Sequence, residues 1–372
     1  MPPSLTILDS PPPGLARALA VNPYLHLGAD HVYQPLRDEL LRPGHPDYDT
    51  VRGLLEKTRQ LDDVATVTRE RLLANGWLVA AGEDLSDRFY LKYVSLEAHT
   101  VCNQGCYFCP VSTHRREDFF MAMETYEAIV AQLAEHRDTI EGVSMINYNE
   151  PTVDKRFVEQ VALLQRYGLP PAVLTNGTGL TAKRVDAILE TGGLVYLSIN
   201  LSTLDRERYA VDREGDHLAI VLKNLEYMKD KPLAKTMEIV VLGQDDAVHE
   251  ADFRAILERF GDSRFDVKKY PVMDRAGLVQ VGMKPAARVQ NLCGCEQTGS
   301  RPLQWAHITP RAEVVLCCQD YHSQYVVGNL QEQTLDEILR GPEMARYRRW
   351  TYGVEEAPQG FMCRNCIYAL SR

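Results

Sequence analysis

Residues 90–110 read YLKYVSLEAHTVCNQGCYFCP, a short apolar stretch followed by three cysteines. The first nine residues are rich in branched and aromatic side chains and predict a buried strand. Cys102, Cys106 and Cys109 then fall within eight positions. In α/β sheets ligands bind at the carboxyl ends of the strands, which is where this group stands. Three thiols are one ligand short of a closed four-coordinate metal site, so the stretch predicts a metal centre with an open position.

Five further apolar stretches follow, and amphipathic segments such as METYEAIVAQLAEHR (123–137) separate them. They are residues 141–151, 170–180, 193–203, 236–244 and 265–274. Strands that alternate with helices indicate right-handed crossovers and a parallel sheet. We therefore expect an α/β fold containing a partial (β/α)6 TIM barrel. Polar segments end the second and third strands, NEPT (149–152) and TNGTGL (175–180), on the edge where the cysteines lie.

A chain of 372 residues exceeds one ordinary domain, and three are expected. Residues 1–88 form an N-terminal winged-helix-like module, with a hairpin in NPYLHLGADHVYQPL (22–36), two helices, and a closing wing at GWLV (76–79). Residues 89–275 form the partial barrel. Residues 276–372 form a small C-terminal cluster domain that includes a hairpin in PLQWAHITPRAEVVLCCQDY (302–321).

Charge and hydropathy exclude several classes of function. A net charge of −10 argues against non-specific nucleic-acid binding, which uses basic surfaces, and leaves an RNA substrate held in a local basic patch as the alternative. No apolar stretch approaches the roughly 20 residues that span a bilayer. The first 20 residues carry neither a basic leader nor a continuous apolar segment, so we expect a cytoplasmic protein whose thiols stay reduced.

The nine cysteines form two groups, which predicts two thiol centres rather than dispersed core cysteines. The first group is the front triad. The second is Cys293, Cys295, Cys317, Cys318, Cys363 and Cys366. A structural zinc site is one interpretation of each group, but zinc prefers four closed ligands, and His99 and His114 fit no zinc spacing around the triad. An iron–sulfur cluster held by three thiolates would leave one iron free for a ligand.

The pattern C-x-x-x-C-x-aromatic-C, at Cys102, Cys106, Phe108 and Cys109, resembles the motif of the radical S-adenosylmethionine (SAM) enzymes. The resemblance implies a 4Fe–4S cluster whose free iron binds SAM. It also implies that an electron from a donor such as flavodoxin or ferredoxin cleaves SAM, and that the 5′-deoxyadenosyl radical abstracts a hydrogen atom from the substrate.

The same resemblance implies which residues bind SAM. Glu150 keeps the acid of a Gly-Gly-Glu-like stretch whose two glycines are absent here, and Asn176 belongs to the family's frequent Thr-Asn-Gly. Ser198 and Asn200 match a polar pair after strand four, Arg213 fits the basic residue against the SAM carboxylate, and Phe108 is expected near the adenine. An ordinary turn at Asn176 and a solvated Arg213 are the alternatives.

The tail cysteines resemble the SPASM/twitch extension of these enzymes, which holds auxiliary 4Fe–4S clusters. Six cysteines suit one auxiliary cluster, and spacing favours Cys295, Cys317, Cys363 and Cys366 as its ligands over Cys293 and Cys318. Ala312 stands where the family usually has glycine. A zinc ribbon is the alternative.

The N-terminal module resembles the PqqD-like element that binds leader peptides, which implies a ribosomally made peptide substrate modified by crosslinking, epimerisation or oxidation. A module that only packs on the barrel is the alternative. A rival function is a small-molecule dehydrogenase, epimerase or decarboxylase acting on a sugar or nucleoside. A non-enzymatic zinc scaffold is a third. No catalytic residue is fixed by the sequence; Cys293, Cys318 and Tyr148 are candidates.

Overall fold

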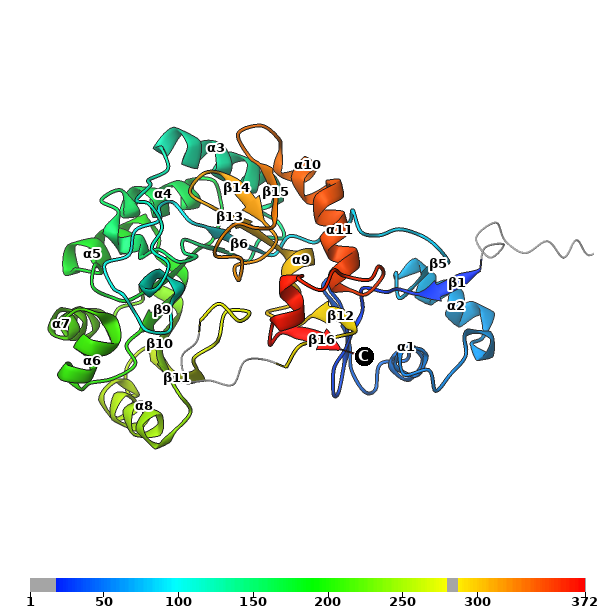
Figure 1. The fold of residues 1–372 in the computed structure, drawn as a ribbon, viewed down its shortest axis with the longest axis horizontal. Coiled ribbons are helices and arrows are strands. Elements are labelled where there is room, and N and C mark those ends of the chain that lie inside the picture. Colours follow the sequence, from blue (N-terminus) through cyan, green and yellow to red (C-terminus); the bar gives the residue numbers. More distant parts are fainter. Residues whose placement is uncertain (1–17, 280–286, 372) are drawn as a thin grey trace, which may run out of the picture.

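The computed structural model describes residues 18–279 and 287–371, so the Pro-rich stretch 1–14 lies outside it. The centre of the molecule is a nine-stranded sheet in the order β11-β10-β9-β8-β7-β6-β13-β14-β15 (Figure 1). Six neighbouring strands are parallel, as the alternation of strands and helices predicts. These six strands are β6 (Tyr93–Leu96), β7 (Gly142–Ser144), β8 (Pro171–Thr175), β9 (Leu194–Asn200), β10 (Ala234–Gly243) and β11 (Phe265–Pro271).

Helices connect the parallel strands and lie along the outer side of the sheet (Figure 1). They are α3 (Met123–Leu133), α4 (Phe157–Arg166), α5 (Ala182–Thr191), α6 (Arg206–Arg213), α7 (Leu218–Met228) and α8 (Ala247–Phe260). Their apolar faces meet the strands in one core that includes Val94, Val143, Val173, Leu197 and Ile239. Burial on both faces explains why these strands are continuously apolar in sequence.

The C-terminal region extends the sheet rather than standing apart from it. Strand β13 (Trp305–Ile308) pairs in parallel with β6, and β14 (Glu313–Val315) and β15 (Val326–Asn329) follow in antiparallel order. β13 and β14 form the hairpin expected from the sequence. The remaining elements are β12 (Leu292–Cys295), paired with β16 (Ala369–Ser371), and the helices α9 (Arg301–Gln304), α10 (Leu335–Arg340) and α11 (Pro342–Thr351).

The N-terminal region contains the expected antiparallel hairpin, β2 (His26–Leu27) and β3 (Val32–Gln34), extended by β4 (Glu39–Leu41). Helices α1 (Tyr48–Leu55) and α2 (Thr66–Ala74) follow. The strand of the expected wing, β5 (Leu78–Ala80), pairs with β1 (Leu19–Val21) and not with the hairpin. The domain boundaries drawn from sequence stay a prediction.

The N-terminal region packs against the C-terminal elements, which lie between it and the parallel strands in Figure 1. Tyr24 and Val79 share a buried cluster with Leu303 and Tyr352. The Gln304 amide donates to the Tyr33 hydroxyl at 2.6 Å and to the Pro35 carbonyl at 3.0 Å. These contacts hold the N-terminal region against the C-terminal elements.

Candidate active site

The front cysteine loop begins where β6 ends and is attached to the end of helix α6. The amide of Gly105 donates to the Arg213 carbonyl at 3.0 Å, and the amide of Tyr107 donates to the Asp212 carbonyl at 3.1 Å. These two bonds place Cys106 beside the side chain of Arg213. The loop is therefore positioned by a helix more than 100 residues later in the chain.

The three thiols of this loop are free and largely shielded from water. Burial raises the pKa of Cys102 to about 12 and that of Cys109 to about 11, and it also raises the pKa of Cys106. Metal binding requires thiolates, and a metal cation supplies the charge that stabilises them. Buried thiols beside a cationic side chain fit an iron–sulfur cluster.

Arg213 is a buried cation, only 1% exposed. Its guanidinium donates to the Asn200 Oδ1 at 2.7 Å and to the Ser202 hydroxyl at 2.9 Å, and Nη1 lies 3.8 Å from the Cys106 Sγ. Its Cζ lies 5.3 Å from the centroid of the Phe108 ring. Within residues 18–279 and 287–371 no carboxylate forms an ion pair with it. A solvated arginine, the alternative taken from the sequence, does not describe this side chain.

Glu150 is the complementary case, a buried carboxyl group that is 2% exposed. Its Oε1 accepts hydrogen bonds from the Thr152 and Thr175 hydroxyls, each at 2.6 Å, and its Oε2 accepts from the Asn176 amide at 2.7 Å. Burial raises the pKa of this carboxyl, and the Asn176 bond works in the opposite direction. The described part of the chain gives it no cationic partner. An ammonium group would compensate the charge.

The other predicted SAM-binding residues are distributed around the same loop. The Asn176 side chain donates to the Asn103 Oδ1 at 2.8 Å, so the Thr-Asn-Gly turn contacts the cysteine loop directly. Asn200 contacts Arg213, and Ser198 lies two residues earlier on β9, on the same face. Hydrogen bonds thus connect Arg213, Asn176 and the Glu150 backbone to the cysteine loop and Asn200 to Arg213, whereas Ser198 is placed only by its position on β9.

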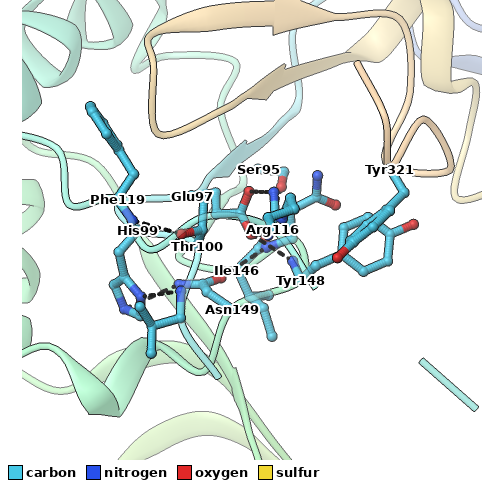
Figure 2. Close-up of polar contacts among 12 residues, drawn as sticks. Ser95, Glu97, His99, Thr100, Arg116, Phe119, Ile146, Tyr148, Asn149 and Tyr321 are labelled. Atoms are coloured by element: carbon cyan, nitrogen blue, oxygen red, sulfur yellow. Dashed lines mark hydrogen bonds and ion pairs between the residues drawn. The ribbon is translucent and has the colours of Figure 1, made fainter. Parts of the chain in front are cut away.

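A second polar group, which the sequence reasoning missed, lies at the end of β6 (Figure 2). Glu97 is fully buried and pairs with Arg116 through two hydrogen bonds, at 2.6 and 2.9 Å. Its Oε1 also accepts from the Tyr148 amide at 2.9 Å. The Arg116 Cζ lies 5.1 Å from the ring centroid of Tyr321. A charged residue within the buried stretch 94–99 was the signal that could have predicted it.

Tyr148 joins the β7 end to the C-terminal region. Its hydroxyl donates a hydrogen bond to the Cys318 carbonyl at 2.6 Å. Its ring packs edge-on against that of Tyr321, with the ring centroids 4.7 Å apart. Tyr148 and Tyr321 pack in one cluster with Cys102 and Cys109. The tyrosine therefore lies between the front cysteine loop and the tail cysteines.

Four of the six tail cysteines line one cavity, which Arg301 and Thr351 also line. They are Cys295, Cys317, Cys363 and Cys366. Cys293 and Cys318 do not belong to its lining. Burial raises the pKa of Cys295 and brings that of Cys366 to about 12. Four thiols around one cavity, those of the buried Cys295 and of three partly buried cysteines, fit the four ligands of a cubane cluster. Ala312 has a φ of +62°, so the backbone there keeps the left-handed conformation that glycine adopts at low cost.

Two further residues next to this cavity carry no signal in the sequence. His307 is 0% exposed, and both of its ring nitrogens lack a hydrogen-bond partner. One of its nitrogens and the thiols of Cys317 and Cys318 all lie within 4.8 Å of one another. The Nε of Arg301 is likewise buried without a partner. Burial lowers the pKa of His307 well below its ordinary value, so the ring is neutral.

Two family models match the chain over these two groups of cysteines. Residues 96–256 match the radical SAM superfamily, and residues 295–367 match the SPASM iron–sulfur cluster-binding domain. The chain is a radical SAM enzyme with a C-terminal SPASM domain. Enzymes of this kind use SAM and 4Fe–4S clusters, and the buried thiols described above fit that requirement.

This radical SAM enzyme resembles relatives that act on different substrates. It is 21% identical over 280 residues to the S-adenosyl-L-methionine-dependent 2-deoxy-scyllo-inosamine dehydrogenase of Niallia circulans. The matched region covers 73% of this chain and 91% of the relative. It shares its fold with Streptococcus suis SuiB bound to precursor peptide SuiA, at a TM-score of 0.58, 12% identity, and coverage of 94% and 93%. It also shares the fold of anSMEcpe with bound AdoMet, at a TM-score of 0.53, 14% identity, and coverage of 75% and 83%.

Among the described residues, no helix is both long and apolar enough to cross a bilayer.

Proposed function

We propose that this radical SAM enzyme modifies a ribosomally made peptide, by crosslinking, epimerising or oxidising one of its residues. Cys102, Cys106 and Cys109 hold the cluster that binds SAM. When both are bound, they supply a 5′-deoxyadenosyl radical that abstracts hydrogen. An electron donor such as flavodoxin or ferredoxin reduces the cluster.

The buried charges next to the front cysteine loop suit the two charged groups of the SAM methionine. Arg213 binds the carboxylate, because its guanidinium has no ion-pair partner among the described residues and offers a planar fork to this group. Glu150 binds the ammonium, since this carboxylate is buried with neutral donors only. Asn176, Ser198 and Asn200 contact the polar parts of the nucleoside. Phe108, held under Arg213, contacts the adenine.

The four thiols around the tail cavity, Cys295, Cys317, Cys363 and Cys366, hold one auxiliary cluster. Four thiolates would saturate a cubane, so a cluster held by these cysteines would supply electron transfer and would leave no iron free for substrate. Tyr148, a catalytic candidate that packs against Cys102 and Cys109, donates a hydrogen bond from its hydroxyl to the Cys318 carbonyl. That bond supports a role in joining the two domains rather than in proton transfer.

The observation that carries the peptide proposal is the three-stranded sheet β2-β3-β4. Strand β4 is at its edge, no described strand pairs with its outer side, and Leu40 on β4 is 42% exposed. An extended peptide can add a strand to such an edge. A groove of about 440 Å3 lies next to it, lined by Tyr33 and Leu40 of the sheet and by Glu296 and Gln304 of the C-terminal region.

The likeness to SuiB supports the same proposal. The SuiB structure holds a precursor peptide, and its fold matches 94% of the length of this chain, including the N-terminal region. By comparison, the anSMEcpe structure matches only 75% of this chain.

A binding experiment with a matched control tests the peptide proposal. The probe is a short precursor peptide from a reading frame beside this gene, labelled with a fluorophore, and the absence of such a frame would count against the proposal. Leu40→Glu puts a charge on the exposed edge strand, and we expect it to weaken binding by about tenfold or more. Val67→Glu on α2, where Val67 is 70% exposed, serves as the control and keeps wild-type affinity. Equal affinity of both variants would reject the edge strand as the peptide site.

Dehydrogenation of an aminocyclitol or another sugar-like compound is the second candidate function. The relative from Niallia circulans favours it, because that relative is a dehydrogenase of such a compound and matches over 91% of its own length. Anaerobic turnover of 2-deoxy-scyllo-inosamine, with 5′-deoxyadenosine formed in step and none formed with the peptide, would establish this function in place of peptide modification.

A further inference from the structure

His307 occupies a position where an uncharged polar ring should have a partner. It lies on β13, which is paired on one side with β6 and on the other with β14. The ring is 0% exposed, and neither nitrogen has a hydrogen-bond partner in the part of the chain that the structure describes. A buried polar group without a partner costs about 1–3 kcal/mol, and native interiors rarely leave one. The ring therefore points to a group that binds there in the complete enzyme.

Two cysteine sulfurs lie close to this ring. A His307 nitrogen lies within 4.8 Å of the thiols of Cys317 and Cys318. Cys317 also lines the four-thiol cavity, whereas Cys318 does not. The histidine is thus next to the cavity on the side of Cys317.

The neighbours of His307 hold its ring plane in place. Trp305, two residues earlier on the same strand, stacks on it with ring centroids 5.3 Å apart and planes 9° apart. Arg301 lies over Trp305, with its Cζ 3.7 Å from the ring centroid, and itself lines the cavity with an unpartnered Nε. Among the described residues, the Nε of Arg301 and the ring nitrogens of His307 are therefore polar atoms without a hydrogen-bond partner close to Cys317 or its cavity.

A donor role fits His307 better than a ligand role. Four thiols already surround the cavity and saturate a cubane, which leaves no iron for an imidazole. An imidazole carries at least one N–H in either protonation state, and the Cys317 sulfur, an acceptor when it is a thiolate, lies within 4.8 Å of one of its nitrogens.

We propose that His307 donates an N–H···S hydrogen bond to the sulfur of Cys317 in the holoenzyme and thereby raises the reduction potential of the auxiliary cluster. The inference rests on the proposed ligand set of Cys295, Cys317, Cys363 and Cys366. Hydrogen bonds to cluster sulfurs stabilise the reduced form, because it carries one more negative charge.

A redox titration of the holoenzyme tests the proposal. His307→Leu removes the donor, and His307→Gln keeps an N–H. At a fixed potential we expect the ratio of reduced to oxidised auxiliary cluster to fall about tenfold in His307→Leu, about 59 mV for a one-electron couple. His307→Gln should recover most of that ratio. Electron paramagnetic resonance follows each cluster, and SAM is added to identify the cluster that it binds.

Two results of this titration overturn the proposal. An unchanged ratio in His307→Leu with the iron content retained means that the ring does not tune the cluster. Loss of the same four irons in both variants means that His307 is a ligand and not a donor. If the wild type itself lacks the auxiliary cluster, the ligand set is wrong, a failure that iron analysis separates from the other two.

A measurement on the wild type covers the case in which His307→Leu does not fold. Protein labelled with 15N-histidine is examined by pulsed electron paramagnetic resonance with the auxiliary cluster reduced. A weak nitrogen coupling, of the size that a hydrogen-bonded ring gives, supports the proposal. A strong coupling from a directly bound nitrogen, or no coupling, overturns it.

Discussion

The guanidinium of Arg213 lies 3.8 Å from the thiol of Cys106, although 107 residues separate them. The contact exists because two backbone hydrogen bonds attach the cysteine loop to the end of α6. Asn200 and Ser202, at the end of β9, hold the other side of the guanidinium. The buried Arg213 side chain thus connects the cysteine loop, helix α6 and the sheet. An anionic ligand bound beside Cys106 would therefore contact this guanidinium.

Replacing Arg213 should weaken SAM binding without removing the clusters. A charge-assisted hydrogen bond contributes roughly 1.5–3 kcal/mol, so we expect Arg213→Gln to raise the Kd for SAM roughly 10- to 100-fold. Equilibrium dialysis under anaerobic conditions measures it. Arg206→Gln, on the same helix but with a side chain 75% exposed, is the control and should leave the Kd unchanged. An unchanged Kd in Arg213→Gln would exclude the carboxylate contact.

Iron content should separate the ligand cysteines from the other thiols of the tail. With two 4Fe–4S clusters the reconstituted enzyme holds about eight irons per chain. We expect Cys363→Ala, which removes a thiol of the cavity, to hold about four. Cys293→Ala and Cys318→Ala are the controls, and each should keep about eight. A halved iron content in either control would transfer the ligand role to that cysteine.

The Glu97–Arg116 pair should matter for stability because one partner is fully buried. Arg116→Ala leaves the Glu97 carboxylate unpaired, and breaking a buried pair costs about 3–5 kcal/mol. We expect the unfolding temperature to fall by several degrees in differential scanning calorimetry. Arg311→Ala, which breaks the exposed pair with Glu117, should change it by less than a degree or two. Similar shifts in both variants would mean that the Glu97 pair contributes no more than a surface contact.

The parallel strands could be predicted because their signal is local. Each apolar stretch, such as 193–203, identifies its own strand, and the helix that follows determines the direction of the next one. The position of the cysteines at the carboxyl end of β6 follows from the same alternation. Four tail thiols chosen by spacing alone, among them Cys295 and Cys317, line one cavity in the structure.

The joining of β13 to β6 could not be predicted, because the two strands are about 200 residues apart and their pairing leaves no local pattern. His307 reads in sequence as one polar residue in a hairpin strand. In the structure His307 is covered by the pairing of β13 with β6 and lies close to Cys317. Neither contact can be inferred from the local pattern of apolar and polar residues. Glu97 and Arg116 were missed for a related reason: a charged residue in a buried strand predicts a partner but does not identify it.

Acid should destabilise the junction between the N-terminal region and the C-terminal elements through His26. The His26 ring is buried and stacks on the Tyr352 ring, and its Nε2 lies 2.6 Å from the Tyr352 hydroxyl oxygen. Burial lowers the pKa of His26 to about 4. In the unfolded chain His26 binds a proton at its ordinary pKa of about 6.5. The contribution of the neutral His26 ring to the free energy of unfolding is therefore fully present above that pH and is lost as the pH falls toward 4. From pH 7 to pH 5 the loss should be about 2 kcal/mol. Unfolding temperatures measured anaerobically across this range for the wild type and for His26→Gln, which retains a hydrogen-bonding side chain but does not titrate, should show the steeper decline in the wild type. Equal declines would assign the acid sensitivity to other groups, such as the buried His99.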